Sequence, residues 1–277
     1  MARFGIAGLT LLFLSACSTT PDQTGRQDAL AGWLAASIQL FAVTDGGGRR
    51  SGSGVVLAAA EDEGVYLVTA GHLLRPGSAE KVFAVDPRSG VPRPAAVVAI
   101  DQTVDVAILQ VEGLTAPAAD LRNDARLGDD VWVVSFPWGR RGTLVTGIVS
   151  QVAGGADVAP EARAIPIEGP VRLIDAAVSY GTSGGGVFHG RSGRLVGIVR
   201  GYRTAKLPLP GAPANALELP IAGETTVVPT TTILCVFAAA DLKHVIPGSG
   251  PGSGPGSGGS ARDACPRVDA DRADAGS

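Results

Sequence analysis

The chain has 277 residues, of which 45% are hydrophobic and 18% are charged, so its composition is globular rather than disordered. The formal net charge of -3 shows no overall basic excess, which argues against nucleic acid as the main partner. The length suits one large domain or two small ones with a substantial core. Small and β-branched residues recur between 39 Gly and 19 Pro, and few stretches are amphipathic helices, which favours an all-β protein.

The N-terminus has the pattern of an export signal. Arg3 supplies a positive charge, and the apolar run after it, residues 4–14, is too short to cross a bilayer as a helix. The run ends in LSAC, which resembles the lipobox of bacterial lipoproteins, whose cysteine is lipidated. We therefore expect residues 1–17 to be a signal peptide with Cys17 as the lipid anchor. The alternative is an ordinary signal peptide with an accidental cysteine.

After the signal, residues 18–27 are polar and predict a tether. Because Ser18 follows the cysteine where an inner-membrane retention signal would be Asp, the lipoprotein resemblance favours the outer membrane or periplasm. Residues 28–36 predict a short helix with Asp28 as its N-cap.

Strand-like runs follow at close intervals in two groups, residues 37–111 and 128–237, separated by a linker rich in Ala, Asp and Arg. Each group holds about six short runs, which indicates two packed six-stranded antiparallel β-barrels, because closure removes exposed sheet edges. Within the second group, residues 202–224 are a Pro-rich insertion, expected to be a surface loop or a cover over a groove. Residues 238–246 predict a short closing helix, and residues 247–277 a Gly/Pro/Ser-rich linker with a polar tail.

Two further cysteines leave their pairing open. Export permits a disulfide between Cys235 and Cys265. However, Cys235 lies in TTILCVF, which predicts a buried strand, whereas Cys265 lies in the polar tail, so two free thiols are equally compatible. Neither cysteine has a histidine at a metal-ligand spacing, and we expect no metal and no cofactor.

One serine, Ser183, lies among glycines in YGTSGGGVFHG. Glycine costs backbone entropy, so this cluster indicates either a flexible hairpin loop or a tight turn that exposes a nucleophile. Two partners are available: His72, where the apolar run YLVTAGHLL breaks, and Asp105, just before the apolar run VDVAILQV. The other histidines, His189 and His244, are expected at the surface.

The order His72, Asp105, Ser183 is that of the chymotrypsin class. The first two residues fall in the first strand group and the serine in the second, so a site is expected in the cleft between the barrels. There His72 would take the proton of Ser183, and Asp105 would hold the imidazole tautomer. The N–H groups of Gly181 and Ser183 would bind the oxyanion.

Several segments in register along residues 37–246 resemble those of the HtrA/DegP-like trypsin-fold serine proteases. SGSGVVL and VYLVTAGHLL are similar to the entry strand and histidine motif, DQTVDVAILQV to the aspartate motif, and LIDAAVSYGTSGGGVFHGRSGRLVGIV to the nucleophile motif. The resemblance implies that residues 28–246 are a serine endopeptidase domain that cleaves unfolded or damaged envelope proteins through an acyl-enzyme. The alternative is a latent protease-fold lipoprotein that binds peptides or partner proteins.

The chain departs from the family at two points. Thr182 stands where the family usually has Asn, and no C-terminal PDZ domain is expected in residues 247–277. In trypsin-like folds the residue at Ala177 lies at the base of the pocket for the P1 side chain, with Arg200 and Gly201 as further expected pocket residues. Since no acid lies at that base, a small or aliphatic P1 residue is predicted. The resemblance implies polypeptide substrates and leaves open whether the chain forms trimers, as its relatives often do.

Overall fold

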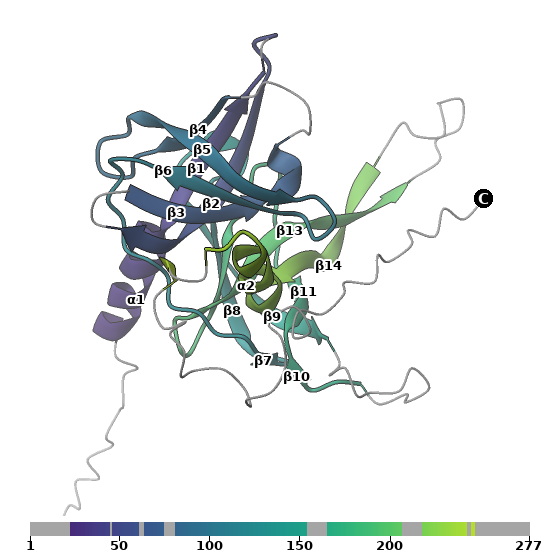
Figure 1. Cartoon of the computed structure of the whole chain (residues 1–277). Helices are drawn as coiled ribbons and strands as arrows, with labels where there is room; N and C mark the ends of the chain where they lie inside the picture. Colours follow the sequence, from purple (N-terminus) through teal and green to yellow (C-terminus); the bar gives the residue numbers. More distant parts are fainter. Residues whose placement is uncertain are drawn as a thin grey trace, which may run out of the picture.

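The two strand groups each close into a barrel. The structure, a computed structural model, describes residues 23–44, 46–60, 64–74, 81–153, 165–206, 218–242 and 245–246. In Figure 1 the first barrel, coloured purple to blue, lies above the second, coloured teal to green. Both barrels are antiparallel and have six strands, which confirms the expected all-β double barrel.

The first barrel closes in the order β1-β2-β3-β6-β5-β4. Its interior is filled by side chains that alternate along the strands, such as Leu40, Leu67 and Leu109, which are fully buried. A short 3-10 turn, η1 (Gly71–Leu73), follows the third strand. The strands are β1 (Ser37–Val43), β2 (Arg49–Ala60), β3 (Gly64–Ala70), β4 (Lys81–Val85), β5 (Pro92–Asp101) and β6 (Val106–Val111).

The second barrel closes in the order β11-β14-β13-β12-β8-β9. A separate pair of short strands, β7 (Ala125–Arg126) and β10 (Glu168–Gly169), lies beside it, and the 3-10 turn η2 (Pro137–Gly139) follows β8. The barrel strands are β8 (Asp130–Ser135), β9 (Thr143–Val152), β11 (Val171–Asp175), β12 (Gly186–His189), β13 (Leu195–Lys206) and β14 (Glu218–Pro229).

A third core, here called the seam, lies between the barrels. In β2, Val56 faces the barrel interior, whereas its neighbours Val55 and Leu57 face the seam. The second barrel contributes Phe188 and the C-terminal helix contributes Phe237, and both side chains are almost completely buried. A strand that is buried on both faces has apolar residues at nearly every position. This is why polar and apolar residues do not alternate along β6.

The C-terminal helix corrects two expectations. Helix α2 covers Thr230–Ala239, where the sequence predicted a strand, and it ends where the closing helix of residues 238–246 was predicted to begin. The β-branched residues of this segment favour a strand locally. However, Ile233, Val236 and Phe237 recur at helical spacing and are all buried in the seam, so tertiary packing outweighs that propensity.

Cys235 therefore lies on a helix rather than on a strand. It is half-buried and disulfide-bonded. Cys265, the partner considered from the sequence, lies outside the described residues, as does Cys17.

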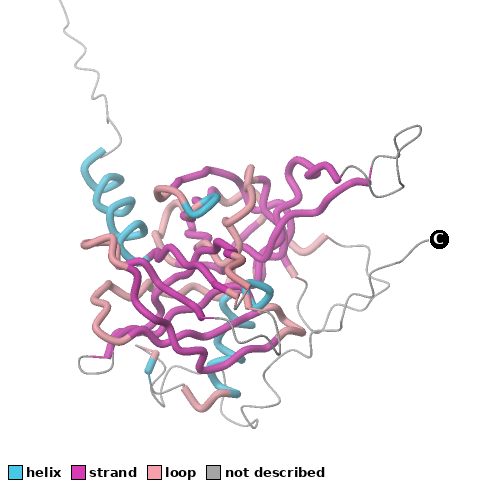
Figure 2. Tube along the Cα trace, turned by 90° about the horizontal axis from the view of Figure 1, so that it is seen from above, coloured by secondary structure: helices cyan, strands magenta, loops and turns pink. Residues whose placement is uncertain are grey.

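The N-terminal helix and the insertion also differ from expectation. Helix α1 spans Gln23–Ala36, so Asp28 lies inside it and is not its N-cap. Figure 2 shows α1 standing at one side of the barrels. In the insertion, β13 continues to Lys206 and β14 begins at Glu218, so both ends of residues 202–224 are paired strands rather than loop. Residues 207–217 lie outside the described part.

None of the helices in the described ranges is long and apolar enough to cross a membrane.

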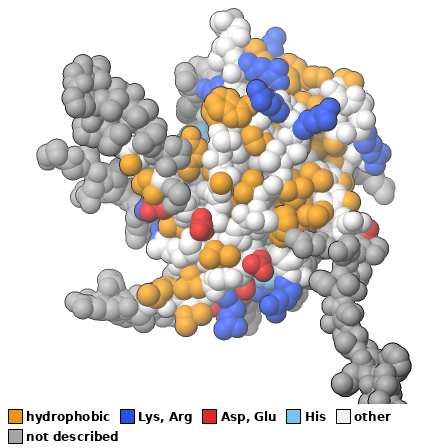
Figure 3. Space-filling model, turned by 180° about the vertical axis from the view of Figure 1, so that it is seen from behind, with side chains coloured by type: hydrophobic (Ala, Val, Ile, Leu, Met, Phe, Trp, Pro, Cys, Tyr) orange, Lys and Arg blue, Asp and Glu red, His pale blue; other side chains and the backbone are white. Residues whose placement is uncertain are grey.

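Charge is unevenly spread over the surface. On the face shown in Figure 3, Lys and Arg side chains gather toward the upper and lower edges, and hydrophobic side chains are exposed between them. The formal net charge of -3 therefore coexists with local basic regions.

The hairpin between β4 and β5 generates a pH prediction. The carboxylate of Asp86 accepts hydrogen bonds from the backbone N–H of Arg88 at 2.9 Å and from Arg93 at 3.2 Å. The Arg88 N–H is the largest of the influences that lower the pKa of Asp86 below its ordinary 3.8, and burial opposes it. A lowered folded-state pKa stabilises the fold above the ordinary value, and this stabilisation is lost as the pH falls through the folded-state pKa.

We therefore expect Asp86→Asn to lower the free energy of unfolding at neutral pH. The difference from the wild type should shrink as the pH falls below 3.8 and through the lower folded-state pKa of Asp86, because below that pKa both side chains are uncharged. Denaturant unfolding of both proteins across that range measures it, with the exposed Glu112→Gln as the control. A difference that stays constant with pH would contradict the electrostatic origin.

Candidate active site

Strand pairing brings the predicted histidine and aspartate together. β3 and β6 are antiparallel neighbours, with Ala70 opposite Val106. His72 follows the end of β3 on η1, and Asp105 immediately precedes β6. The end of one strand and the start of its neighbour lie at the same edge of the barrel, so the two side chains meet although 33 residues separate them.

Asp105 holds His72 through two groups. Its Oδ2 lies 2.9 Å from the ring Nδ1 of His72, and its Oδ1 accepts the His72 backbone N–H at 2.7 Å. The Asp105 side chain is 8% exposed, whereas that of His72 is 51% exposed. Asp105 adopts a left-handed φ of 61°, which Asp tolerates better than most residues. The carboxylate is therefore buried and fixed, and the imidazole faces the solvent.

Ser183 lies on the loop between β11 and β12, and hydrogen bonds tie this loop to β13. The backbone N–H of Gly184 donates to the carbonyl of Val199 at 2.8 Å, and the Val199 N–H donates to Gly185 at 2.8 Å. Gly184 has a φ of +80°, and a Cβ there would lie 2.1 Å from the carbonyl oxygen of Ser53. The glycine after the serine is thus required by a close approach of the two barrels.

The two N–H groups predicted to bind an oxyanion differ from their neighbours. Those of Thr182, Gly184 and Gly185 donate to backbone carbonyls. Within the described ranges, no acceptor lies in hydrogen-bonding reach of the N–H of Gly181 or of Ser183. Donors left without an internal partner beside a nucleophile are the groups that can bind a developing negative charge.

Aromatic residues flank this loop. The Trp138 N–H donates to the Tyr180 carbonyl at 2.8 Å, and because a trans peptide directs its C=O and N–H in opposite directions, this bond orients the Gly181 N–H away from η2. The Trp138 and Tyr180 rings lie 5.1 Å apart and are 62% and 43% exposed. A Cβ on Gly181, whose φ is +88°, would lie 2.7 Å from the Trp138 nitrogen, so only glycine fits there.

Ser53 of β2, which was not predicted from the sequence, clamps the loop from the other barrel through hydrogen bonds. Its hydroxyl donates to the Gly181 carbonyl and accepts from the Phe136 N–H, both at 2.9 Å. Its backbone N–H donates to the Ser183 carbonyl at 2.8 Å. Ser53 is fully buried. The signal was present in SGSGVVL, where a serine between two glycines interrupts a strand pattern, but only the fold shows what it contacts.

The residues predicted to line the P1 pocket all lie on the second barrel. Ala177 is exposed on the loop after β11, and Gly201 of β13 has open space where a Cβ would be. Arg200 instead forms an ion pair with Asp105, with its Nε 3.4 Å from Oδ2. The sequence did not predict this contact, because it joins residues of different barrels.

The structure pairs His72 with Asp105 on the first barrel. On the second barrel it leaves the N–H groups of Gly181 and Ser183 without an acceptor among the described residues. The ring of His72 makes its hydrogen bonds to Asp105, and within the described residues none joins it to Ser183. Such a bond commonly shortens only when substrate is bound. The Arg200 guanidinium offsets part of the negative charge that Asp105 presents to His72.

The other two histidines were both predicted at the surface. His189 is 4% exposed, so its predicted surface position is wrong: the ring is enclosed between the second barrel and its own hairpin turn. His244 lies outside the described residues.

Comparison with known proteins identifies the family. The sequence profile of the trypsin-like peptidase domain matches residues 52–198, and the chain belongs to this family. The protein named "Probable periplasmic serine endoprotease DegP-like" from Rhizobium meliloti is 35% identical over 153 residues, covering 54% of this chain and 27% of that protein. "Protease Do-like 1, chloroplastic" from Arabidopsis thaliana is 33% identical over 180 residues, covering 62% of this chain and 36% of that protein.

The chain therefore spans only 27% and 36% of the lengths of these relatives. Among solved structures, the active form of the Rv3671c protease from M. tuberculosis superposes with a TM-score of 0.57 at 21% identity. The match covers 86% of this chain and 92% of that one, which shows that the double-barrel fold is shared.

The Ser53 clamp generates a stability prediction. Ser53→Ala leaves the buried Gly181 carbonyl and Phe136 N–H without a partner, which costs about 1–3 kcal/mol of unfolding free energy. Denaturant unfolding measures the loss. Ser51→Ala, two residues earlier on β2, is the matched control and should change stability by less than about 0.5 kcal/mol. Equal effects of the two substitutions would contradict the clamp.

Proposed function

We propose that the chain is a serine endopeptidase in which Ser183 is the nucleophile, His72 the general base and Asp105 the residue that orients His72. The observation that carries the proposal is the buried Asp105 carboxylate 2.9 Å from Nδ1 of an exposed His72, on the barrel facing the Ser183 loop. The unpartnered N–H groups of Gly181 and Ser183 support an oxyanion site on the same loop.

In this mechanism His72 removes the hydroxyl proton of Ser183 as the oxygen attacks the peptide carbonyl. The negative charge that develops on the carbonyl oxygen is stabilised by the N–H groups of Gly181 and Ser183. His72 then gives the proton to the leaving amine, and water hydrolyses the acyl-enzyme by the reverse steps. Asp105 keeps the proton on Nδ1, so that the other ring nitrogen is free to act as the base.

The substrate class and the location are further parts of the proposal. The relatives named as periplasmic DegP-like endoproteases support polypeptide substrates in the cell envelope, unfolded or damaged envelope proteins in particular. Anchoring through Cys17, which lies outside the described residues, and assembly into trimers both remain predictions.

The alternative is a latent member of the family that binds peptides without cleaving them. Two observations favour it: the Arg200 guanidinium lies 3.4 Å from Asp105, and His72 is bonded to Asp105 but not to Ser183 within the described residues. If Arg200 partly neutralises Asp105 at rest, activity would require a change in the site on substrate binding.

Labelling with a fluorophosphonate probe tests the mechanism. We expect the full chain to form an adduct on Ser183 that is absent from Ser183→Ala and retained in Ser179→Ala, a serine on the same loop. The modified residue is assigned by mass spectrometry. If folded wild-type protein forms no Ser183 adduct, the measurement is repeated with unfolded protein present. An adduct then indicates a regulated peptidase, and its continued absence favours the binding protein.

A profile of cleavage sites tests the P1 pocket. With Ala177 at its base and no acid there, we expect small or aliphatic residues at P1. Ala177→Asp should shift the preference toward Arg and Lys by about tenfold or more, because a carboxylate at that position would pair with a basic P1 side chain. A wild-type profile dominated by Arg or Lys would contradict this placement of the pocket.

A further inference from the structure

A second serine, histidine and aspartate meet on the opposite end of β12 from the Ser183 loop. His189 is the last residue of β12 and is 4% exposed. Its Nδ1 lies 2.9 Å from the hydroxyl of Ser192, and its Nε2 lies 3.2 Å from Oδ2 of Asp129. The proposed peptidase mechanism uses none of these residues.

The hydrogen bonds determine the state of the imidazole. The backbone N–H of Ser192, which can only donate, points at Nδ1 of His189 at 3.1 Å. Nδ1 therefore carries no proton, and the proton of the neutral ring is on Nε2, whose N–H is directed at the Asp129 carboxylate. The Ser192 hydroxyl then donates a hydrogen bond to Nδ1. This is the direction of hydrogen bonding in an activated serine, with the two ring nitrogens exchanged.

Asp129 is held in its charged form. Its Oδ2 also accepts the backbone N–H of Arg126 at 2.8 Å. Burial acts to raise the pKa of Asp129, but the Arg126 N–H and the nearby His189 outweigh it, so the pKa lies below its ordinary value. A charged carboxylate on Nε2 stabilises the imidazolium that would form when His189 accepts a proton.

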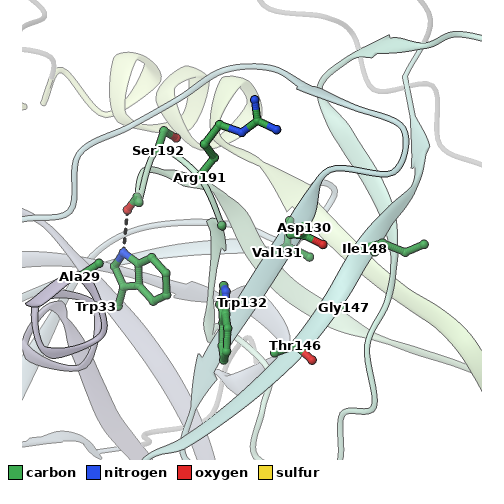
Figure 4. Close-up of a pocket in the computed structure, with 12 residues that line it drawn as sticks. Ala29, Trp33, Asp130, Val131, Trp132, Thr146, Gly147, Ile148, Arg191 and Ser192 are labelled. Atoms are coloured by element: carbon green, nitrogen blue, oxygen red, sulfur yellow. Dashed lines mark hydrogen bonds between the residues drawn. The ribbon is translucent and has the colours of Figure 1, made fainter. Parts of the chain in front are cut away.

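The serine lies at the rim of a cavity. Ser192 and its neighbour Arg191 line a cavity of about 710 Å³ between α1 and the second barrel. In Figure 4 they lie together on the hairpin turn, with Trp33 of α1 and Trp132 of β8 below them. Trp33 donates to the carbonyl of Gly193 at 2.8 Å, which ties the turn to α1.

The cavity combines an apolar wall with a cation. Trp132 and Ile148 offer apolar surface, and Ile148 is 44% exposed. The Arg191 guanidinium has no ion-pair partner among the described residues, so it is available to an oxyanion. Ser192 is exposed on the same turn, where a reagent can reach its hydroxyl.

We propose that Ser192 is a second nucleophile of this chain, activated by His189 and Asp129, that accepts acyl groups from esters with an aromatic or apolar acyl part. The Ser192 oxygen attacks the ester carbonyl, and its proton passes to Nδ1 of His189, which then releases the hydrogen bond from the Ser192 N–H. The bond to the alcohol breaks as His189 protonates the leaving oxygen. Water then attacks the acyl-serine by the same route and returns the proton, so the net reaction is ester hydrolysis.

A purely structural role for His189 makes a different prediction. Stabilisation of the hairpin needs only the bonds from the Ser192 N–H and to Asp129. It gives the Ser192 hydroxyl no more reactivity than that of any exposed serine. Ser89, on the turn between β4 and β5, is such a serine: its hydroxyl accepts the Val91 N–H and donates to Asp86, and it has no histidine partner among the described residues.

The test uses the full chain carrying Ser183→Ala, treated with a fluorophosphonate probe and read by mass spectrometry of the digested protein. We expect an adduct on Ser192 that forms at least about a hundred times faster than any adduct on Ser89, the gain that a positioned base provides. The adduct should be absent from Ser183→Ala/Ser192→Ala and retained in Ser183→Ala/Ser89→Ala. With p-nitrophenyl acetate, release of nitrophenolate should follow the same pattern.

The proposal is overturned if Ser192 reacts no faster than Ser89 in the Ser183→Ala protein. The exposed position of Ser192 makes its replacement by alanine harmless to the fold, so loss of the adduct reports the residue itself. Because Ser183 is absent throughout, the outcome is independent of whether Ser183 cleaves peptides.

Discussion

The seam between the two barrels is the constraint on which the rest of the structure depends. Each barrel could fill its own interior, but several strands are apolar on both faces, and their outer faces must be buried against something. Packing barrel against barrel, with α2 over the junction, satisfies this need. It also fixes the position of His72 and Asp105 in one barrel relative to Ser183 in the other.

Polar contacts across the seam set the orientation of peptide groups, which apolar packing alone leaves undefined. Burial of hydrophobic surface has no preferred direction, so it cannot orient a peptide group. The Ser53 hydroxyl, hydrogen-bonded to Gly181 and Phe136, supplies that direction to the Ser183 loop. The Arg200–Asp105 pair also crosses the seam, and it links the Asp105 carboxylate to a strand that borders the proposed substrate pocket.

A similar arrangement of a serine, a histidine and an aspartate occurs twice on this fold. In both places an imidazole is held by a carboxylate, and in both a serine belongs to a loop at one end of β12. The surroundings differ: His72 is half exposed, whereas His189 is buried and bonded to its serine without any ligand. Burial of the second imidazole gives its hydrogen bonds a well-defined geometry, while exposure of the first leaves room for a substrate.

The sequence by itself determined the fold class and suggested the residues of the proposed site, because both depend on local signals. Alternating apolar residues between turn-forming residues predict strands wherever one face is buried, and His72, Asp105 and Ser183 lie at the breaks between such runs. The tertiary structure alone decided whatever depends on contacts between distant segments. Residues 230–239 form a helix although their β-branched residues favour a strand, because a helix buries their apolar side chains in the seam. The tertiary structure buried His189, brought Arg200 to Asp105 and gave Ser53 its partners, because each contact joins residues whose separation in the chain carries no periodic signal.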